Sequence, residues 1–330
     1  MTQSRDSLIS LVDTPYYHCI SRCVRRAFLC GEDKYTGNSF EHRRQWMVDR
    51  VRFLTDVFSI EVCAYAIMSN HYHLVLFVNE AELVSCSDSD ICERWGKIYS
   101  ISPLVSRWLK GELSSDIQSS EALKVIAEWR KRLSSISWFM RCLNEFIAVK
   151  ANKEDKCKGR FWEGRFKSQA LLDEKALLTC MAYVDLNPIR AKMASKIETS
   201  EYTSVFERIH NKTHDDDKQE RAGSKPLVKF VGAEHQNQPQ GINFTLIDYL
   251  ALVDWSGRII REGKRGVISE QTPALLGILG LDNDTWLSLA SDFGKTYHGA
   301  VGSLEELALF AEHTGKQWIS GKNKLRRIYQ

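Results

Sequence analysis

The sequence predicts an α+β protein: a ferredoxin-like antiparallel sheet with helices on one face, followed by a small, mostly helical C-terminal domain. Runs of strand-forming residues alternate with longer segments of helical periodicity in the order β-α-β-β, helices, β-α. Split β-α-β units in that order are typical of a ferredoxin-like sheet. A polar segment punctuated by Gly and Pro then precedes a second stretch of globular composition.

The first part of the chain contains most of the predicted sheet. Strands are expected at 16–24, 60–68 and 71–78, and a helix at 40–58. In that helix, apolar residues recur at helical spacing from Met47 to Phe58. The last two strands are separated only by Ser69 and Asn70, which predicts a β-hairpin.

Two helical stretches, at about 90–110 and 121–149, follow the hairpin. We interpret 79–149 as a helical insertion with a polar surface loop between its two main helices. A short strand is expected at 168–172, and then a helix that ends near Asn187. Pro188 discourages continuation of that helix because it lacks a backbone N–H and its ring clashes with the preceding turn.

Two domains and a linker are expected. Residues 1–210 form the first domain, 211–242 a polar linker, and 243–330 a mostly helical, basic C-terminal domain. Helices of the C-terminal domain are predicted near 273–280, 284–293 and 303–314. DNA binding by this domain is a hypothesis based on its cations, which are Arg258, Arg261, Lys264, Arg265 and the basic segment 322–327.

Composition excludes some classes of protein. No apolar stretch approaches the roughly 20 residues that a membrane helix needs, and the N-terminus lacks the pattern of a secretory signal peptide. Nine scattered cysteines fit free thiols in a reducing compartment better than a disulfide framework. A cytoplasmic location is therefore expected. Basic residues gather with aromatic ones at 150–167, which suits either a nucleic-acid backbone or a solvated loop.

Two histidines stand one residue apart at the start of an apolar run, in the segment SNHYHLVLFV. In a strand, positions i and i+2 share a face, so His71 and His73 project the same way. Two imidazoles on one face can hold a metal ion. They can equally face solvent on the polar side of a strand.

The helix that ends before Pro188 contains two further reactive side chains. Tyr183 and Asn187 are four residues apart and so share a helical face. Asn187 offers a carbonyl oxygen to a cation, and Tyr183 offers a phenolic oxygen that can act as a nucleophile. If this face turns toward the hairpin, His71, His73 and Asn187 form a ligand set suited to Mg²⁺ or Mn²⁺. The structural alternatives are a tyrosine at the edge of the core and an asparagine that ends the helix.

Together, these segments resemble the REP-associated tyrosine transposases, which are single-tyrosine members of the HUH nuclease superfamily. The resemblance lies in four segments that stand in the family's order: YHCISRCVRRAFL, MSNHYHLVL, GRFWEGRFKS and YVDLNPIRA. It covers about residues 15–195; the insertion and the C-terminal domain depart from the shortest members. It implies the HUH nuclease fold, with His71, His73 and Asn187 as metal ligands and Tyr183 as the nucleophile.

The resemblance also implies a reaction. Tyr183 would cleave single-stranded DNA near the foot of a hairpin in a palindromic repeat, leaving a 5′-phosphotyrosine link and a free 3′-hydroxyl. Arg190 either contacts DNA or caps its helix, and Trp162 would stack a base. The residues expected to contact DNA are Arg22, Arg25, Arg26, Lys158, Arg160, Trp162, Arg165, Lys167 and Arg190. Relatives include monomers and homodimers, so either state is expected, and no membrane partner is.

Two other functions fit the same residues. A DNA-hairpin-binding protein that no longer cuts would keep the fold and the basic surface without the chemistry. A metal-dependent phosphodiesterase would use water in place of Tyr183 as the nucleophile. Covalent attachment of DNA to the protein separates the transposase-like function from both.

Overall fold

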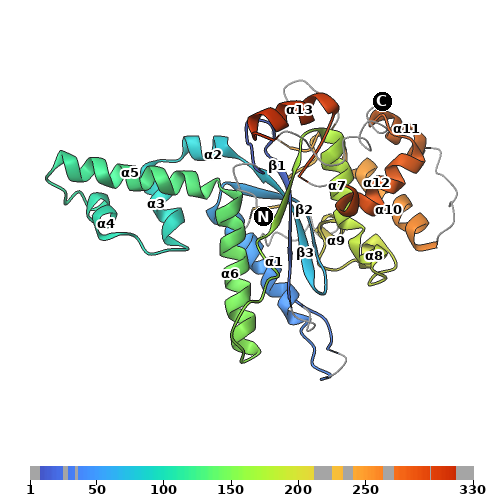
Figure 1. Ribbon diagram of the computed structural model, residues 1–330, viewed down its shortest axis with the longest axis horizontal. Coiled ribbons are helices and arrows are strands. Elements are labelled where there is room, and N and C mark those ends of the chain that lie inside the picture. The colour runs from blue at the N-terminus through green and yellow to red at the C-terminus, as the bar shows by residue number, and fades with distance from the viewer. Residues whose placement is uncertain are drawn as a thin grey trace.

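The computed structural model describes residues 8–24, 29–33, 36–211, 225–232, 241–262, 271–297 and 299–316. Its centre is a five-stranded sheet in the order β2-β3-β1-β4-β5, with helices on both sides (Figure 1). The α+β class expected from the sequence is confirmed. The sheet is mixed rather than antiparallel throughout, because β5 pairs parallel with β4 while the other pairs are antiparallel.

The strands are short and mostly buried. Their bounds are β1 Tyr16–Arg22, β2 Ile60–Ile67, β3 His71–Val78, β4 Lys167–Leu171 and β5 Ala300–Val301. β2 and β3 are buried along nearly their whole length, which accounts for their almost continuous apolar sequence. They form the predicted hairpin, in which Ile67 lies opposite Tyr72.

Helices form most of the other described regular structure. Before β4 they are α1 His42–Val57, α2 Glu80–Ser85, α3 Asp88–Gly96, α4 Pro103–Leu109, α5 Asp116–Leu133 and α6 Ile136–Glu154. Between β4 and the C-terminal part they are α7 Glu174–Asp185, α8 Asn187–Arg190, the 3₁₀ helix η1 Ile197–Thr199 and α9 Ser204–Asn211. The C-terminal part contains α10 Leu246–Glu262, α11 Gln271–Ile278, α12 Asn283–Thr296 and α13 Leu304–His313.

The expectation that helices cover only one face of the sheet is wrong. Tyr72 points to one face, where its hydroxyl donates a hydrogen bond to Oδ1 of Asn144 in α6 (2.6 Å). His73 points to the opposite face, where its ring centroid lies 5.7 Å from that of Tyr183 in α7. Because successive strand residues alternate in direction, α6 and α7 cover different faces (Figure 1). Nearly every residue of α7 is buried, so this helix needs cover from the sheet and from a second helix.

The insertion expected at 79–149 is helical, but its helices have different bounds. The stretch predicted as one helix at 90–110 is broken where Ser102 caps α4 and Pro103 begins it. α5 begins at Asp116, inside the segment expected to be a loop. In Figure 1, α2 to α5 project from the sheet as an arm.

The C-terminal part is mostly helical and packs directly on the first part. α12 lies along α7, and β5 extends the sheet beside β4. Within the expected linker, residues 225–232 and 241–242 are described, and the backbone N–H of Val228 donates to the carbonyl of Val62 in β2. The cations Lys264 and Arg265 and the basic segment 322–327 lie outside the described residues.

Candidate functional site

One face of the sheet gathers polar side chains from three neighbouring strands. Arg22 in β1 lies opposite His71 in β3, and His18 in β1 lies opposite Gln169 in β4. Residues opposite each other share a face, and so do residues two apart in a strand. These four side chains and His73 therefore all lie on the side that α7 covers.

The structure brings the expected nucleophile against one expected metal ligand of β3, His73, and the other, His71, lies next to that histidine. The ring centroids of His71 and His73 are 4.9 Å apart, and the ring of Tyr183 lies 5.7 Å from that of His73. Only Leu186 separates α7 from α8, so the chain from Tyr183 to Asn187 follows an almost continuous helical path. Side chains from distant parts of the sequence thus form one cluster.

Arg190 links Tyr183 to Asn187. Its guanidinium lies 3.9 Å from the centroid of the Tyr183 ring and donates a hydrogen bond to Oδ1 of Asn187 (2.6 Å). A second bond reaches the carbonyl of Ala290 in α12 (2.5 Å). Burial lowers the pKa of Arg190 to about 10, and the interactions with Tyr183 and Asp292 oppose that shift. The side chain therefore remains a cation at neutral pH.

The histidines of the cluster are neutral at neutral pH. Burial lowers the pKa of His71 to about 4, and the positive charges of Arg22 and Arg190 act in the same direction. Burial, together with the neighbouring His18 and His71, holds the pKa of His73 well below its usual range. A neutral imidazole keeps one unprotonated nitrogen, as a metal ligand must.

His18 belongs to the cluster, although sequence reasoning did not identify it. Its Nε2 lies 2.9 Å from Nδ1 of His73, and its Nδ1 lies 3.2 Å from Oε1 of Gln169. The contact with His73 depends on the pairing register of β1 with β3, in which His18 lies opposite Val75. No local pattern in the sequence specifies that register.

α12 closes the cluster on the side away from the sheet. The ring of Phe293 lies 5.9 Å from that of Tyr183 and 6.4 Å from that of His18. The next residue is Gly294, and a Cβ at this position would lie only 2.6 Å from Oη of Tyr183. The absence of a side chain at Gly294 therefore makes room for the tyrosine hydroxyl. Sequence reasoning treated α12 only as part of a C-terminal domain.

Two imidazoles of the cluster fit a metal ion, and the amide does so only after a rearrangement. Nε2 of His73 is buried and has no hydrogen-bond partner among the described residues. Nδ1 of His71 lies 2.6 Å from Oδ1 of Asn70, a contact that leaves Nε2 of His71 available as a ligand. Oδ1 of Asn187 already accepts from Arg190. Within the described part of the chain, no three His, Cys, Asp or Glu side chains are grouped so as to hold a metal ion.

The residues expected to contact DNA have different surroundings. Arg22 and four cations near β4 are exposed, the four being Lys158, Arg160, Arg165 and Lys167. Trp162 is buried, stacks edge-on against Tyr72 and donates its indole N–H to the carbonyl of Asn144 (2.8 Å). Its position does not support the base-stacking role expected of it. Arg25 and Arg26 lie outside the described residues.

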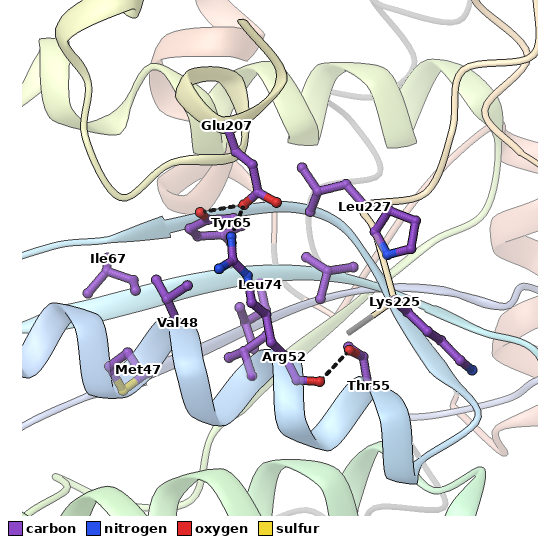
Figure 2. A pocket seen from close by; sticks show the side chains of 13 residues that line it. Met47, Val48, Arg52, Thr55, Tyr65, Ile67, Leu74, Glu207, Lys225 and Leu227 are labelled. Atoms are coloured by element: carbon purple, nitrogen blue, oxygen red, sulfur yellow. Dashed lines mark hydrogen bonds and ion pairs between the residues drawn. The ribbon is translucent and has the colours of Figure 1, made fainter. Parts of the chain in front are cut away.

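Two hollows lie near the sheet. A cavity of about 30 Å³, enough for roughly one water, lies between α1 and the face of β2 and β3 that faces away from the histidine cluster (Figure 2). In its wall, the hydroxyl of Tyr65 donates to Glu207 (2.8 Å), and Arg52 and Lys225 also line the cavity. An open hollow of about 500 Å³ has Ser69 and Pro188 in its wall and none of the side chains of the cluster.

Comparisons with known proteins add little to this geometry. No family model matches the chain, and no curated protein does. Among solved structures, the chain is similar to one described as a REP-associated tyrosine transposase bound to a REP hairpin. The TM-score is 0.38 and the identity 9%, over 69% of this chain and all of that chain; a likeness this distant establishes neither a shared fold nor a shared function. In the described ranges, no helix combines the length and apolar character needed to cross a bilayer.

Proposed function

We propose that this protein is a metal-dependent single-stranded DNA endonuclease and strand transferase that acts at DNA hairpins through a 5′-phosphotyrosine intermediate. The observation that supports this most is the convergence of Tyr183 with His71 and His73 on one buried face of the sheet. A nucleophilic phenol beside His73, with the imidazole of His71 next to that histidine, is in keeping with the arrangement that the sequence motifs imply. The reaction class follows from these side chains rather than from the fold.

In the proposed reaction, Oη of Tyr183 attacks the phosphorus of one phosphodiester. The new oxygen–phosphorus bond forms as the bond to the 3′ oxygen breaks. The phenol gives up its proton and the leaving 3′ oxygen takes one up, so a 3′-hydroxyl remains. Attack by a 3′-hydroxyl on the phosphotyrosine reverses these steps and rejoins the strand, with no external energy source.

Arg190 is the residue best placed to assist Tyr183. Its guanidinium lies against the phenol ring and stays charged at neutral pH. A cation at this distance stabilises the negative charge that develops on the phenolic oxygen and on the phosphate. When Asn187 becomes a ligand, Arg190 must leave Oδ1 of the amide, and its fork of donors then suits a phosphate.

A divalent ion, Mg²⁺ or Mn²⁺, would be held by His71, His73 and Asn187, and when bound it would withdraw charge from a phosphate oxygen. The histidines are suited to this because burial keeps them neutral. The contacts of His71 Nδ1 with Asn70 and of His73 Nδ1 with His18 orient the two rings, and with them the lone pairs on Nε2.

Exposed cations offer a path for the DNA backbone that leads to the cluster. Arg22 lies opposite His71 across the β1–β3 pair, and Lys167 begins β4 on the other side of β1. The backbone N–H of Glu163 donates to the carbonyl of Arg22, which holds the 160–167 segment beside β1. Positive side chains beside a buried site suit a phosphate backbone that enters it.

The test uses single-stranded oligonucleotides that form hairpins, each labelled on the 3′ side of the expected cut, with Mg²⁺ or Mn²⁺. The panel includes palindromes that flank the gene. Wild type, Tyr183→Phe and His71→Ala are run on a denaturing gel, and His42→Ala, an exposed histidine of α1, serves as the control. The expected result is a labelled protein band that requires metal, persists in the control and disappears in both site variants.

Other outcomes contradict the proposal. Free cleaved DNA that persists in Tyr183→Phe would identify a phosphodiesterase that uses water. Tight hairpin binding without cleavage, equal in wild type and Tyr183→Phe, would identify a DNA-hairpin-binding protein. Two observations favour this second candidate function: α12 covers Tyr183, and Arg190 occupies Oδ1 of Asn187.

A further inference from the structure

A chain of buried hydrogen bonds runs from the C-terminal part of the protein to His73. Nε2 of Gln169 lies 2.8 Å from the carbonyl oxygen of Tyr297, and Oε1 of Gln169 lies 3.2 Å from Nδ1 of His18. Nε2 of His18 lies 2.9 Å from Nδ1 of His73. The exposed fractions of these side chains are 7% for Gln169, 0% for His18 and 2% for His73. Bulk water therefore does not compete for any of the three bonds.

The direction of every bond in this chain follows from its first member. A backbone carbonyl can only accept, so the Gln169 group that faces Tyr297 must be the amide NH₂. The amide oxygen of Gln169 then faces His18 and must accept from its Nδ1–H. His18 is completely buried, which favours the uncharged ring, and in an uncharged ring with a protonated Nδ1 the other nitrogen, Nε2, is an acceptor. Nδ1 of His73 must therefore carry the proton that it donates to His18.

One consequence concerns the other nitrogen of His73. If Nδ1 is protonated in a neutral ring, Nε2 carries a lone pair, and this Nε2 is the buried atom without a partner among the described residues. A buried acceptor left unpaired is costly unless something else satisfies it. A cation held on this face would do so.

We propose that His18 is a positioning residue: through Gln169 and the Tyr297 carbonyl, it fixes His73 as the Nδ1-protonated tautomer and leaves the Nε2 lone pair for a divalent cation. The cation itself rests on the proposed function above, whereas the tautomer does not. Tyr297 directly follows α12. The C-terminal part therefore determines which ring nitrogen of His73, in β3, carries the proton. Partners of this kind commonly orient metal-binding histidines.

The first experiment measures the tautomer in the metal-free, full-length protein. Two-bond ¹H–¹⁵N correlation spectra of ¹⁵N-histidine-labelled protein at neutral pH distinguish the two tautomers, and loss of a signal in His73→Gln assigns it. The expected result is protonated Nδ1 in wild type. In His18→Phe and Gln169→Leu, we expect His73 to shift toward protonated Nε2. In the control His313→Phe, a half-exposed histidine of α13, His73 should be unchanged.

A second measurement is isothermal titration calorimetry with Mn²⁺ in the absence of DNA, which gives the affinity of the protein for the ion. Loss of an orienting partner typically weakens metal binding about 10–100-fold, so we expect that change in His18→Phe and Gln169→Leu. His18→Gln, whose amide can accept from His73 and donate to Gln169, should recover part of the affinity. A merely structural role for His18 would give no such recovery.

The outcomes are separable. Protonated Nε2 on His73 in wild type, or a tautomer unchanged in both variants, overturns the proposal. If wild type binds no Mn²⁺ but shows protonated Nδ1 that responds to the variants, the tautomer assignment stands and the proposed function fails. If His18→Phe does not fold, Gln169→Leu and the wild-type spectrum still decide the matter.

Discussion

At the scale of single residues, Arg190 connects α8 to the nucleophile and to α12. It contacts the Tyr183 ring, Oδ1 of Asn187 and the carbonyl of Ala290. We expect Arg190→Met to slow formation of the DNA–protein adduct by about 10²–10³-fold, the usual cost of removing one stabilising group from a transition state. Single-turnover gels with labelled hairpin DNA measure this rate.

A lysine at position 190 should recover part of the rate, because it keeps the charge but not the planar fork of donors. The matched control is Arg141→Met in α6, an exposed arginine paired with Glu145, which should react at the wild-type rate. Equal rates for Arg190→Met and wild type would remove Arg190 from the mechanism.

A second residue-scale prediction concerns Gly294. An added Cβ would lie 2.6 Å from Oη and 3.1 Å from Cζ of Tyr183. Overpacking of this kind costs about 1–3 kcal/mol, against a gain of up to about 1 kcal/mol for replacing glycine within a helix. We therefore expect Gly294→Ala to be destabilising in urea unfolding. In the Tyr183→Phe background the cost should fall, because the atom nearest to the new methyl is gone.

Gly294→Ala and Tyr183→Phe together form a double-mutant cycle. Its control is Gly277→Ala in α11, since nothing lies within 4 Å of the added Cβ. It should be neutral or stabilising in both backgrounds. A cost of Gly294→Ala that is the same with tyrosine and phenylalanine at position 183 would show that the hydroxyl does not need the space, because independent sites give additive costs.

Residues of the site were predictable where local spacing determines direction. His71 and His73 share a face in any strand, and Tyr183 and Asn187 share one in any helix, whatever surrounds them. His18, Gln169 and Phe293 were not predictable, since they reach the cluster through strand register and through packing of α12 on α7. The burial of Trp162 was missed for the same reason: its partner Asn144 lies in a different element.

At the scale of elements, Asp185 at the end of α7 joins three helices. Its buried carboxylate accepts from the Ser204 hydroxyl (2.5 Å) and the Val205 N–H (3.0 Å) at the start of α9. It also accepts from the Tyr249 hydroxyl in α10 (2.6 Å). Asp185→Ala leaves these buried donors unpaired, so we expect unfolding free energy to fall by about 3 kcal/mol or more.

Urea unfolding with tryptophan fluorescence measures this cost. Asp185→Asn should cost less, because an amide carbonyl still accepts from α9. Asp254→Ala, which removes a partly exposed partner of Arg258, should change stability by no more than about 0.5 kcal/mol. If Asp185→Ala were no worse than Asp254→Ala, the three helices would be held by apolar contact alone.

The elements themselves were largely predictable, whereas the arrangement of layers was not. Strand-forming runs and helical periodicity identify β1 to β4 and α7 to within a few residues. Helices were expected on one face because the order of strands and helices is typical of a ferredoxin-like sheet, whereas α7 is buried nearly all round and lies on the opposite face from α6. Such a helix reads as buried, but periodicity does not say which two surfaces bury it.

At the scale of the whole molecule, the C-terminal part is continuous with the site. α12 packs on α7, β5 extends the sheet, and Tyr297 ends the hydrogen-bond chain that begins at His73. A sequence divided at a polar segment gives no indication of this, because contacts across the division depend on tertiary packing. Site geometry and C-terminal packing are thus expected to respond together to mutation.

The exposed cations around β4 give the last prediction, which concerns how the whole surface binds DNA. Each phosphate that Lys or Arg neutralises releases counterions, so affinity falls with salt in proportion to the number of phosphates bound. We expect the triple variant Lys158→Gln, Arg160→Gln, Arg165→Gln to bind single-stranded hairpin DNA more weakly. The slope of log affinity against log salt should flatten by about 1 for each phosphate that the variant no longer binds. Fluorescence anisotropy across a salt series measures both quantities.

Lys124→Gln in α5, on the projecting arm, is the control and should leave the slope unchanged (Figure 1). A triple variant with the wild-type slope would mean that the DNA follows another surface.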